Sequence, residues 1–191
     1  MEGRGLRVVG GEKRGLKLRE MPKDATCRPT LDRVKVAMFD IVRFELSGKA
    51  LDLFSGTGQI GIEAISNGCE KAVFCDKDPV SLRITRENIK KAGFESRAEV
   101  LDCDYKHFLR HRAKKGEFKI IFLDPPYETQ LLEKSLIYIS DADCLTKDGV
   151  VVAETLRERE MPDEAGSLVK TKSYAYGQVA LHIYRRKEEN I

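Results

Sequence analysis

The 191-residue sequence predicts an α/β protein built on a mostly parallel sheet, and three observations carry this prediction. Short apolar runs with strand character alternate with longer segments of helical spacing, which is the pattern of βα units. A glycine-rich turn at 56–61 joins the first apolar run to a helical segment, as in ligand-binding βα folds. The stretches 167–175 and 179–184 instead alternate apolar and polar residues around Gly177, which indicates an antiparallel hairpin.

Start and stop signals set the expected boundaries of the elements. The segment 7–18 is predicted to form a small hairpin with a glycine turn, and Thr30 can cap a helix whose apolar face reaches Val42. Strands are expected at 50–53, 71–75, 98–101, 118–123 and 149–153. Helices are expected from Asp78-Pro79 to Gly93, after Asp104, and over 131–139. The chain is thereby divided into an appendage, residues 1–27, and one domain, residues 28–191.

Composition excludes several classes of protein. Hydrophobic residues make up 41% of the chain and charged residues 34%, and this apolar content is too high for a disordered chain. No apolar run approaches the roughly 18 residues of a membrane span, so a transmembrane protein is also excluded. The first residues contain no apolar signal segment, so a cytoplasmic location without a membrane partner is expected. The five cysteines are odd in number and never in C-x-x-C spacing, which favours free thiols. His107 and His111 have metal-ligand spacing but no third ligand nearby, so no metal is predicted.

The run Asp124-Pro125-Pro126-Tyr127 directly follows the apolar strand at 118–123. Two prolines remove two backbone donors, so the carbonyls of Asp124 and Pro125 can point at a ligand instead of continuing a ladder. A planar exocyclic amine has two N–H bonds, which the Asp124 carboxylate and the Pro125 carbonyl can accept while the Tyr127 ring stacks on the base. The run therefore predicts a site for a planar amine. The alternative is a strand that ends in an ordinary proline turn.

A second motif is the glycine loop that begins at Gly56. Gly56 and Gly58 permit positive φ and bring backbone N–H groups close to a ligand at a helix N-terminus. The spacing to Gly61 also fits the dinucleotide fingerprint G-x-G-x-x-G, and Asp76 lies where that fingerprint places its ribose-binding acid. The loop alone thus fits NAD as well as S-adenosylmethionine. Asp52 beside the loop would repel a pyrophosphate but suits an ammonium and a sulfonium group, which favours S-adenosylmethionine.

Carboxylates are predicted at four neighbouring strand ends. Asp52, Asp76, Asp104 and Asp124 each end or follow one parallel strand, and the carboxyl ends of parallel strands meet at the edge where ligands bind. Four such groups would repel one another unless a cationic, hydroxyl-rich ligand lay among them. For Asp76 and Asp104, a role as helix caps is the alternative.

Basic residues are concentrated near the start of the chain. The formal net charge is only +3, but residues 1–35 contain ten basic and five acidic side chains. The basic rim of the predicted hairpin, formed by Arg7, Lys13, Arg14 and Lys17, suits a grip on phosphate groups. A mobile charged terminus is the alternative.

Six stretches of the chain carry a resemblance to a known family: RVVGGEKRGLKL, RPTLDRVKVAMFD, LDLFSGTGQIGIEA, the turn at 76–78, DPPY, and GQVALHIYRR. On these stretches the chain resembles, nearly end to end, the RsmD-type 16S ribosomal RNA guanine-N2 methyltransferases. The resemblance implies a Rossmann-like class I methyltransferase fold with a seven-stranded, mostly parallel sheet and a small N-terminal hairpin. Glu154-Thr155 departs from the acid-serine pair common in the family, and Tyr105 stands where a small residue is common, which affects the adenine pocket wall.

The resemblance also implies a reaction and the residues that perform it. The reaction is transfer of a methyl group from S-adenosylmethionine to the exocyclic N2 of one guanine in 16S rRNA, within an assembling or assembled small ribosomal subunit. The implied catalytic residues are Asp124, Pro125, Pro126 and Tyr127. The implied cofactor-binding residues are Arg28, Thr30, Asp52, Phe54, Ser55, Gly56, Thr57, Gly58, Asp76, Lys77, Asp104 and Tyr105. The expected RNA-binding residues are Arg7, Lys13, Arg14, Lys17 and Arg33.

Three other functions remain open on the sequence alone. A DNA adenine-N6 or protein glutamine-N5 methyltransferase would use the same proline motif on a similar planar amine. A nicotinamide-dependent oxidoreductase would reuse the glycine loop but leaves the run 124–127 without a role. A non-catalytic rRNA-binding assembly factor would need only the basic hairpin.

Overall fold

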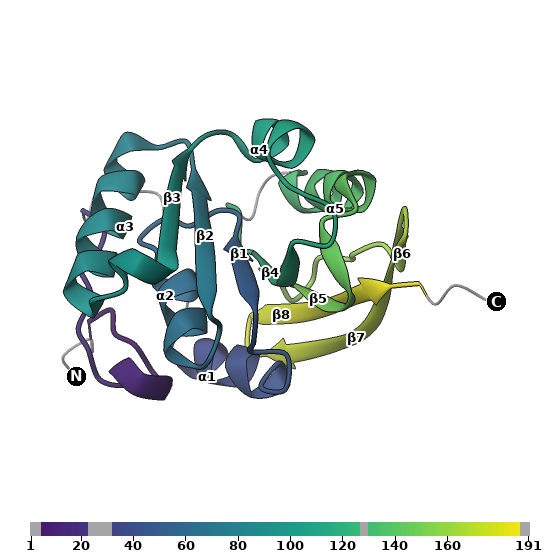
Figure 1. Cartoon of the computed structure of the whole chain (residues 1–191). Helices are drawn as coiled ribbons and strands as arrows, with labels where there is room; N and C mark the ends of the chain where they lie inside the picture. Colours follow the sequence, from purple (N-terminus) through teal and green to yellow (C-terminus); the bar gives the residue numbers. More distant parts are fainter. Residues whose placement is uncertain (1–4, 23–31, 127–129, 188–191) are drawn as a thin grey trace.

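The computed structural model describes residues 5–22, 32–126 and 130–187 (Figure 1). Its sheet has eight strands in the order β3-β2-β1-β4-β5-β8-β7-β6, parallel from β3 to β5 and antiparallel from β5 to β6. The strands are β1 (Lys49–Asp52), β2 (Lys71–Asp76), β3 (Ala98–Asp102), β4 (Phe118–Leu123), β5 (Leu145–Leu156), β6 (Glu164–Ala165), β7 (Leu168–Tyr176) and β8 (Val179–Arg186). The predicted α/β class and the antiparallel end of the sheet are confirmed.

Helices cover both faces of this sheet, giving three layers (Figure 1). One face is covered by α1 (Asp32–Ile41), α2 (Gln59–Ser66) and α3 (Pro79–Ala92), and the other by α4 (Tyr105–His111) and α5 (Leu131–Ala142). Two short 3-10 helices, η1 (Gly11–Lys13) and η2 (Glu95–Arg97), complete the described elements. Each face therefore has its own apolar cluster, and burial of these clusters drives the assembly of the layers.

Two strand predictions needed correction. β5 runs from Leu145 to Leu156, longer than the expected 149–153, because its beginning pairs with β4 at Phe118 and its end pairs with β8 as far as Val179. The sheet has eight strands rather than the seven implied by the family resemblance, because the two-residue β6 adds to the antiparallel edge. Propensity patterns do not show such pairings between distant segments.

The helix boundaries follow the local signals in the sequence. Asp78 caps α3 by accepting a hydrogen bond from the backbone N–H of Ser81 at 2.7 Å, and Pro79 occupies the first turn. Gly93 ends the same helix with φ of 72°, the left-handed conformation that favours glycine. The predicted cap Thr30 lies outside the described residues, and α1 is described from Asp32.

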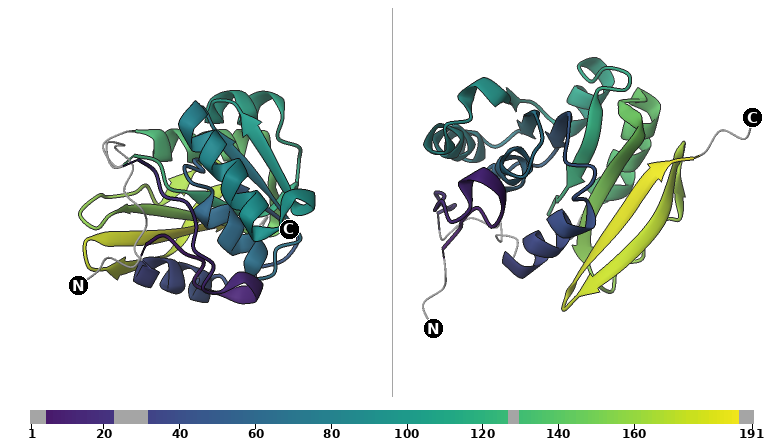
Figure 2. Two further views of the ribbon diagram at one scale, coloured as in Figure 1. Left: turned by 90° about the vertical axis from the view of Figure 1, so that its left-hand side faces the viewer. Right: turned by 60° about the horizontal axis from the view of Figure 1, so that its bottom comes forward.

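The N-terminal segment packs against the main body of the protein rather than standing apart (Figure 2). Its hairpin is reduced to one antiparallel bridge, between Arg7 and Lys17, and the side chains of Leu6, Val8 and Leu18 join the core cluster of α1 to α3. The side chain of Glu63 in α2 is fully buried and accepts hydrogen bonds from the backbone N–H groups of residues 9 and 10 at 2.8 and 2.6 Å. The predicted division after residue 27 falls among the residues that are not described.

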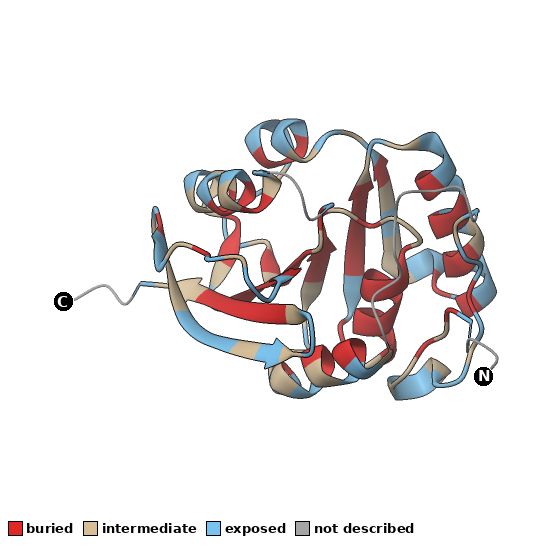
Figure 3. Ribbon diagram, turned by 180° about the vertical axis from the view of Figure 1, so that it is seen from behind, coloured by how far each residue is buried: buried red, intermediate tan, exposed pale blue. Residues whose placement is uncertain are grey.

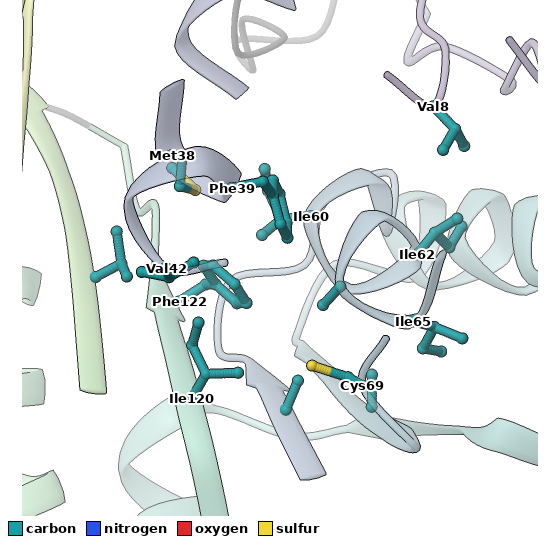
Figure 4. Packing of buried hydrophobic residues seen from close by; sticks show 14 of the residues in the cluster. Val8, Met38, Phe39, Val42, Ile60, Ile62, Ile65, Cys69, Ile120 and Phe122 are labelled. Atoms are coloured by element: carbon teal, nitrogen blue, oxygen red, sulfur yellow. The ribbon is translucent and has the colours of Figure 1, made fainter. Parts of the chain in front are cut away.

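Buried residues are concentrated in the central strands and in α2 (Figure 3). Every residue of α2 is buried. Beneath α1 and α2, the ring of Phe39 packs on that of Phe122 with 5.4 Å between centroids, next to Ile60 and Val42 (Figure 4). The cysteines at 69, 75, 103 and 144 are free thiols, as predicted, while Cys27 is not among the described residues. In the described part of the chain, no helix is long and apolar enough to cross a membrane.

Candidate active site at the carboxyl edge of the sheet

The order of the strands places the predicted site residues along one edge of the sheet. β1 lies between β2 and β4, and all three run parallel, so their carboxyl ends are neighbours. Asp52 ends β1 and pairs with Phe122, two residues before Asp124, while Asp76 ends β2. β1 is connected through α2 to its neighbour β2, whereas β4 is connected through α5 to β5 on the opposite side of the β1–β4 pair. The carboxyl ends of β1 and β4 therefore form the switch point in strand order, where α/β sheets bind ligands.

The glycine loop has the conformation expected from its sequence. Gly56 and Gly58 have φ of 52° and 77°, and Gly58 is the N-cap of α2. A Cβ atom at Gly58 would lie 2.9 Å from Cγ2 of Thr85, so any side chain there would collide with α3. The loop therefore requires glycine both for its backbone angle and for its close approach to the neighbouring helix.

The carboxylate of Asp76 orients the loop. One of its oxygens accepts a hydrogen bond from the N–H of Gly56 at 2.8 Å, and the other accepts one from the N–H of Asp78 at 2.9 Å. Because a carboxylate has about four lone-pair directions, two remain for the hydroxyl groups of a ribose. Asp76 can thus shape the loop and still bind a ligand.

Two side chains of α3, not identified from the sequence, hold the carbonyls of the loop. The hydroxyl of Thr85 donates to the carbonyl of Gly56 at 2.9 Å, and the amide of Asn88 donates to the carbonyl of Thr57 at 2.9 Å. Asn88 also exchanges hydrogen bonds with the backbone of Arg19, at 2.6 and 3.0 Å, which ties the N-terminal segment to the loop. Both side chains are fully buried. The available signal was two polar residues on an otherwise apolar helix face.

Asp52 is a buried carboxyl behind the loop, with 2% of its surface exposed. It accepts a hydrogen bond from the N–H of Gly61 in the first turn of α2 at 2.9 Å. Burial raises the pKa of Asp52 to about 7, against the effect of this hydrogen bond, and the charges of Asp124 and Asp76 raise it further. A cation bound at this edge would favour the charged form of Asp52, as expected for a sulfonium or ammonium ligand.

Two polar atoms of the loop and its helix have no hydrogen-bond partner within the described ranges. They are the hydroxyl oxygen of Ser55 and the amide nitrogen of Gln59, in side chains that are 6% and 5% exposed. Buried polar atoms are normally paired, so unpaired ones at a candidate site indicate groups that a ligand can complete. The loop therefore fits a ligand with polar atoms, such as the amino-acid end of S-adenosylmethionine.

An aromatic wall stands beside the loop. The ring of Tyr105 lies 5.6 Å from that of Phe54, which follows β1, and 6.0 Å from that of Tyr138 in α5. Asp104 caps α4 by accepting from the N–H of Lys106 at 2.9 Å, so its alternative role as a helix cap is realised. Lys77 is exposed in the turn between β2 and α3.

The proline motif continues from β4 onto the same edge. Asp124 is half-buried, Pro125 is buried and Pro126 is exposed. Tyr127 lies outside the described residues, as do the predicted cofactor residues Arg28 and Thr30.

The predicted RNA-binding cations are divided between two places. Arg33 is exposed at the start of α1, and its guanidinium lies 3.0 Å from where a Cβ of Gly177 would be, at the β7–β8 turn on the carboxyl edge. Lys13 instead lies over the ring of Phe94, 5.5 Å from its centroid, and its N–H donates to Ser66 at the far end of α2. The structure therefore places Arg33 beside the β7–β8 turn, next to the carboxyl end of β5, and Lys13 and the adjacent Arg14 near the amino edge.

The other two cations of the predicted hairpin, Arg7 and Lys17, are bridged to each other through their backbones. The side chain of Arg7 forms an ion pair with Asp32 at 2.9 Å, and Lys17 is exposed. No cluster of three metal-binding side chains occurs among the residues whose positions are described.

Comparisons with known proteins identify the family. The model of a family described as "Conserved hypothetical protein 95" matches residues 6–185. A Bacillus subtilis protein named "Putative rRNA methyltransferase YlbH" is 38% identical over 184 residues, which cover 95% of this chain and 100% of the relative. The "Ribosomal RNA small subunit methyltransferase D" of Escherichia coli is 30% identical over 188 residues, covering 96% and 91% of the two chains. This chain belongs to the RsmD-like methyltransferase family.

Solved structures agree with this placement. The structure described as "Putative methyltransferase yhhF from Escherichia coli" superposes with a TM-score of 0.83 at 26% identity, covering 95% of this chain and 98% of that one. A Salinibacter ruber RNA methyltransferase, solved with S-adenosyl-L-homocysteine, has a TM-score of 0.62 at 22% identity, covering 85% and 95% of the two chains. The second likeness concerns the fold alone. Together they confirm the Rossmann-like methyltransferase fold.

Proposed function

We propose that this protein transfers a methyl group from S-adenosylmethionine to the exocyclic N2 of a guanine in 16S rRNA. The observation that carries the proposal is the adjacency of two motifs: Asp52 and the glycine loop end β1, and Asp124-Pro125 follow the paired strand β4. A methyl donor at the first motif and a planar amine at the second would meet across one strand spacing, about 4.8 Å.

The chain's own residues supply the features that a methionine-derived nucleoside needs. Asp76 has lone pairs for ribose hydroxyls. The unpaired polar atoms of Ser55 and Gln59, beside the loop whose carbonyls are held by Thr85 and Asn88, remain for the amino-acid end. Asp104 and the ring of Tyr105 provide the acid and the wall of an adenine pocket. When bound, S-adenosylmethionine supplies an electrophilic methyl group on a positively charged sulfur.

Asp124 and Pro125 prepare the nucleophile. The lone pair of guanine N2 is delocalised into the ring, so the free amine is a weak nucleophile. Hydrogen bonds from its two N–H groups to the Asp124 carboxylate and the Pro125 carbonyl localise that pair and fix its line of approach. N2 would gain one bond to the methyl carbon while the carbon–sulfur bond of the sulfonium breaks and leaves its electron pair on sulfur. N2 would also release one proton, for which the Asp124 carboxylate is an adjacent acceptor. Tyr127 stacks on the guanine, which leaves its own stack to reach the pocket.

The choice of rRNA over other planar amines is supported by the relatives. The Bacillus subtilis and Escherichia coli relatives described above align over nearly the whole chain and are named as rRNA methyltransferases, and the second name specifies the small ribosomal subunit. The adenine-N6 and glutamine-N5 alternatives share the proline motif, but neither of these two relatives is named for such a reaction. The small ribosomal subunit is therefore the proposed partner and the cytoplasm the proposed location.

The experiment that tests the proposal is a labelling assay with methyl-labelled S-adenosylmethionine. The purified protein is incubated in parallel with 16S rRNA, small ribosomal subunits, duplex DNA and a protein extract. We expect label in rRNA, free or within subunits, and none in DNA or protein. Label in DNA or protein would favour the alternative methyltransferases, and binding of the cofactor without any transfer would favour a non-catalytic assembly factor.

A further inference from the structure

The strongest concentration of unbalanced positive charge surrounds α4. Residues 105–116 contain five lysines and arginines, two histidines and no acidic residue, since the flanking acids are Asp104 and Glu117. The five cations are Lys106, Arg110, Arg112, Lys114 and Lys115, and all are exposed. Within the described residues, only Lys115 forms an ion pair, with Asp143 at 2.9 Å.

The aromatic surface between these cations is also suited to RNA. The ammonium of Lys106 and the guanidinium of Arg110 lie over the ring of Tyr138 in α5, 5.9 and 4.9 Å from its centroid. These contacts hold two cations in place at the α4–α5 junction without neutralising them. Ordered, uncompensated cations interleaved with an aromatic ring match the charge of a nucleic-acid backbone.

The position of α4 connects this surface to the candidate site. α4 begins directly after the carboxyl end of β3, and its first residue, Tyr105, packs against Phe54, two residues before the glycine loop. α5 begins shortly after the proline motif and lies beside α4 (Figure 1). The ring of Tyr138 in α5 packs against that of Tyr105 in α4. This basic surface runs along α4 from the carboxyl edge to the amino ends of β4 and β5, where Lys115 pairs with Asp143. An RNA that inserts a guanine beside Asp124 therefore has the start of this surface next to it at the carboxyl edge.

The N-terminal segment offers less free charge at that edge. Arg7 and Arg19 form ion pairs with Asp32 and Glu87, and Lys35 is buried with its ammonium bound to the carbonyl of Arg7. Lys13 and Arg14 lie towards the opposite edge, beside the end of α2. Among the described residues, α4 and the turn after it thus carry more exposed cations without a carboxylate partner than the N-terminal segment does.

We infer that the exposed face of α4 and the turn after it, residues 106–115, form the main phosphate-binding surface for the RNA substrate. The identity of the partner rests on the proposed function. RNA phosphates lie along α4, Arg110 and Arg112 contact them, and a nucleotide further along the RNA carries the guanine to the carboxyl edge. Each phosphate contact releases bound counterions, so the affinity of the complex depends on salt.

The test compares three charge-removing triple variants in binding to a 16S rRNA transcript at several salt concentrations. The first is Arg110→Gln/Arg112→Gln/Lys114→Gln. The second removes three of the four cations of the predicted hairpin and keeps Arg7, which is paired with Asp32: Lys13→Gln/Arg14→Gln/Lys17→Gln. The third is a matched control on the exposed face of α3: Arg86→Gln/Lys90→Gln/Lys91→Gln. Thermal unfolding and S-adenosylmethionine binding are measured for each.

We expect the α4 variant to bind RNA about 10- to 100-fold more weakly near 0.1 M salt and to lower the slope of log affinity against log salt by about 2. Its S-adenosylmethionine affinity should match that of the wild type. The control should retain the wild-type slope. A wild-type slope in the α4 variant, or a larger loss in the hairpin variant, would overturn the inference.

Two further variants guard against loss of the fold. Arg112→Gln/Lys114→Gln leaves both contacts with Tyr138 intact and should still lower the slope, while Arg110→Lys/Arg112→Lys keeps the charge and should restore it. Methyl transfer is measured separately, so the two proposals can fail independently. A wild-type protein that binds rRNA with this slope but never methylates it contradicts the proposed function and leaves the surface supported.

Discussion

Asp52 gives the protein a specific dependence of stability on pH. Burial raises the pKa of this carboxyl from 3.8 to about 7. Between these values the folded protein holds a proton that the unfolded chain has released. The contribution of Asp52 to stability is therefore most favourable below about pH 4 and is lost as the pH rises towards 7. The full difference corresponds to about 4 kcal/mol, a large part of the stability of an ordinary domain.

The variant Asp52→Asn should remove this dependence. The amide oxygen of the asparagine can still accept the hydrogen bond from the N–H of Gly61, which is 2.9 Å long in the wild type. The asparagine side chain carries no charge at any pH. We expect the variant to be more stable than the wild type at pH 8, by up to about 4 kcal/mol, and close to it at pH 4. Urea unfolding of both proteins from pH 4 to 8 measures the difference. A difference that does not change with pH would refute the reasoning, as would a variant less stable than the wild type at pH 8.

The same carboxyl should couple cofactor binding to proton release. A bound sulfonium or ammonium group favours ionised Asp52, so S-adenosylmethionine should bind more tightly as the pH rises through 7. Calorimetric titration in buffers of different ionisation enthalpy should show protons released by the wild type near pH 7. With Asp52→Asn, this release should disappear. Equal release from both proteins would place the titrating group elsewhere.

Three further predictions concern the loop and the proline motif. Thr85→Val removes the hydrogen bond to the carbonyl of Gly56 and should weaken S-adenosylmethionine binding about five- to tenfold, while Thr85→Ser should leave it unchanged. Equal affinities of Thr85→Val and the wild type in a calorimetric titration would count against this role. Gly61→Ala places a Cβ 2.3 Å from the ring of Phe74 and should destabilise the fold by about 1–3 kcal/mol, seen in thermal unfolding; an unchanged melting temperature would show that the ring can move. Asp124→Ala should abolish methylation but keep cofactor binding, and loss of both would argue against its assigned role.

Features set by local chemistry were predictable from the sequence. The cap at Asp78, the stop at Gly93 and the positive φ of Gly56 and Gly58 follow from interactions between residues close in the chain. The parallel core of the sheet followed from the alternation of apolar runs and helical segments. These signals depend on one segment at a time and need no knowledge of distant contacts.

Features set by contacts between distant segments were not predictable. The buried roles of Glu63 and Asn88 depend on backbone groups of the N-terminal segment, more than 50 residues away in the chain. The many cations of the predicted hairpin led to the prediction of a phosphate-binding surface there. In the structure, Lys13 lies near the amino edge and Arg7 forms an ion pair with Asp32. Charge composition shows how many cations a segment has, but not which face of the fold they reach.

The chemical identity of the methylated product tests the central claim most directly. 16S rRNA labelled by the wild-type protein is digested to nucleosides, and the labelled nucleoside is identified by mass spectrometry. We expect N2-methylguanosine as the labelled product with the wild type, and no labelled nucleoside with Asp124→Ala. A label on a ring nitrogen, on a ribose oxygen or on adenine, or full activity without the carboxylate of Asp124, would contradict it.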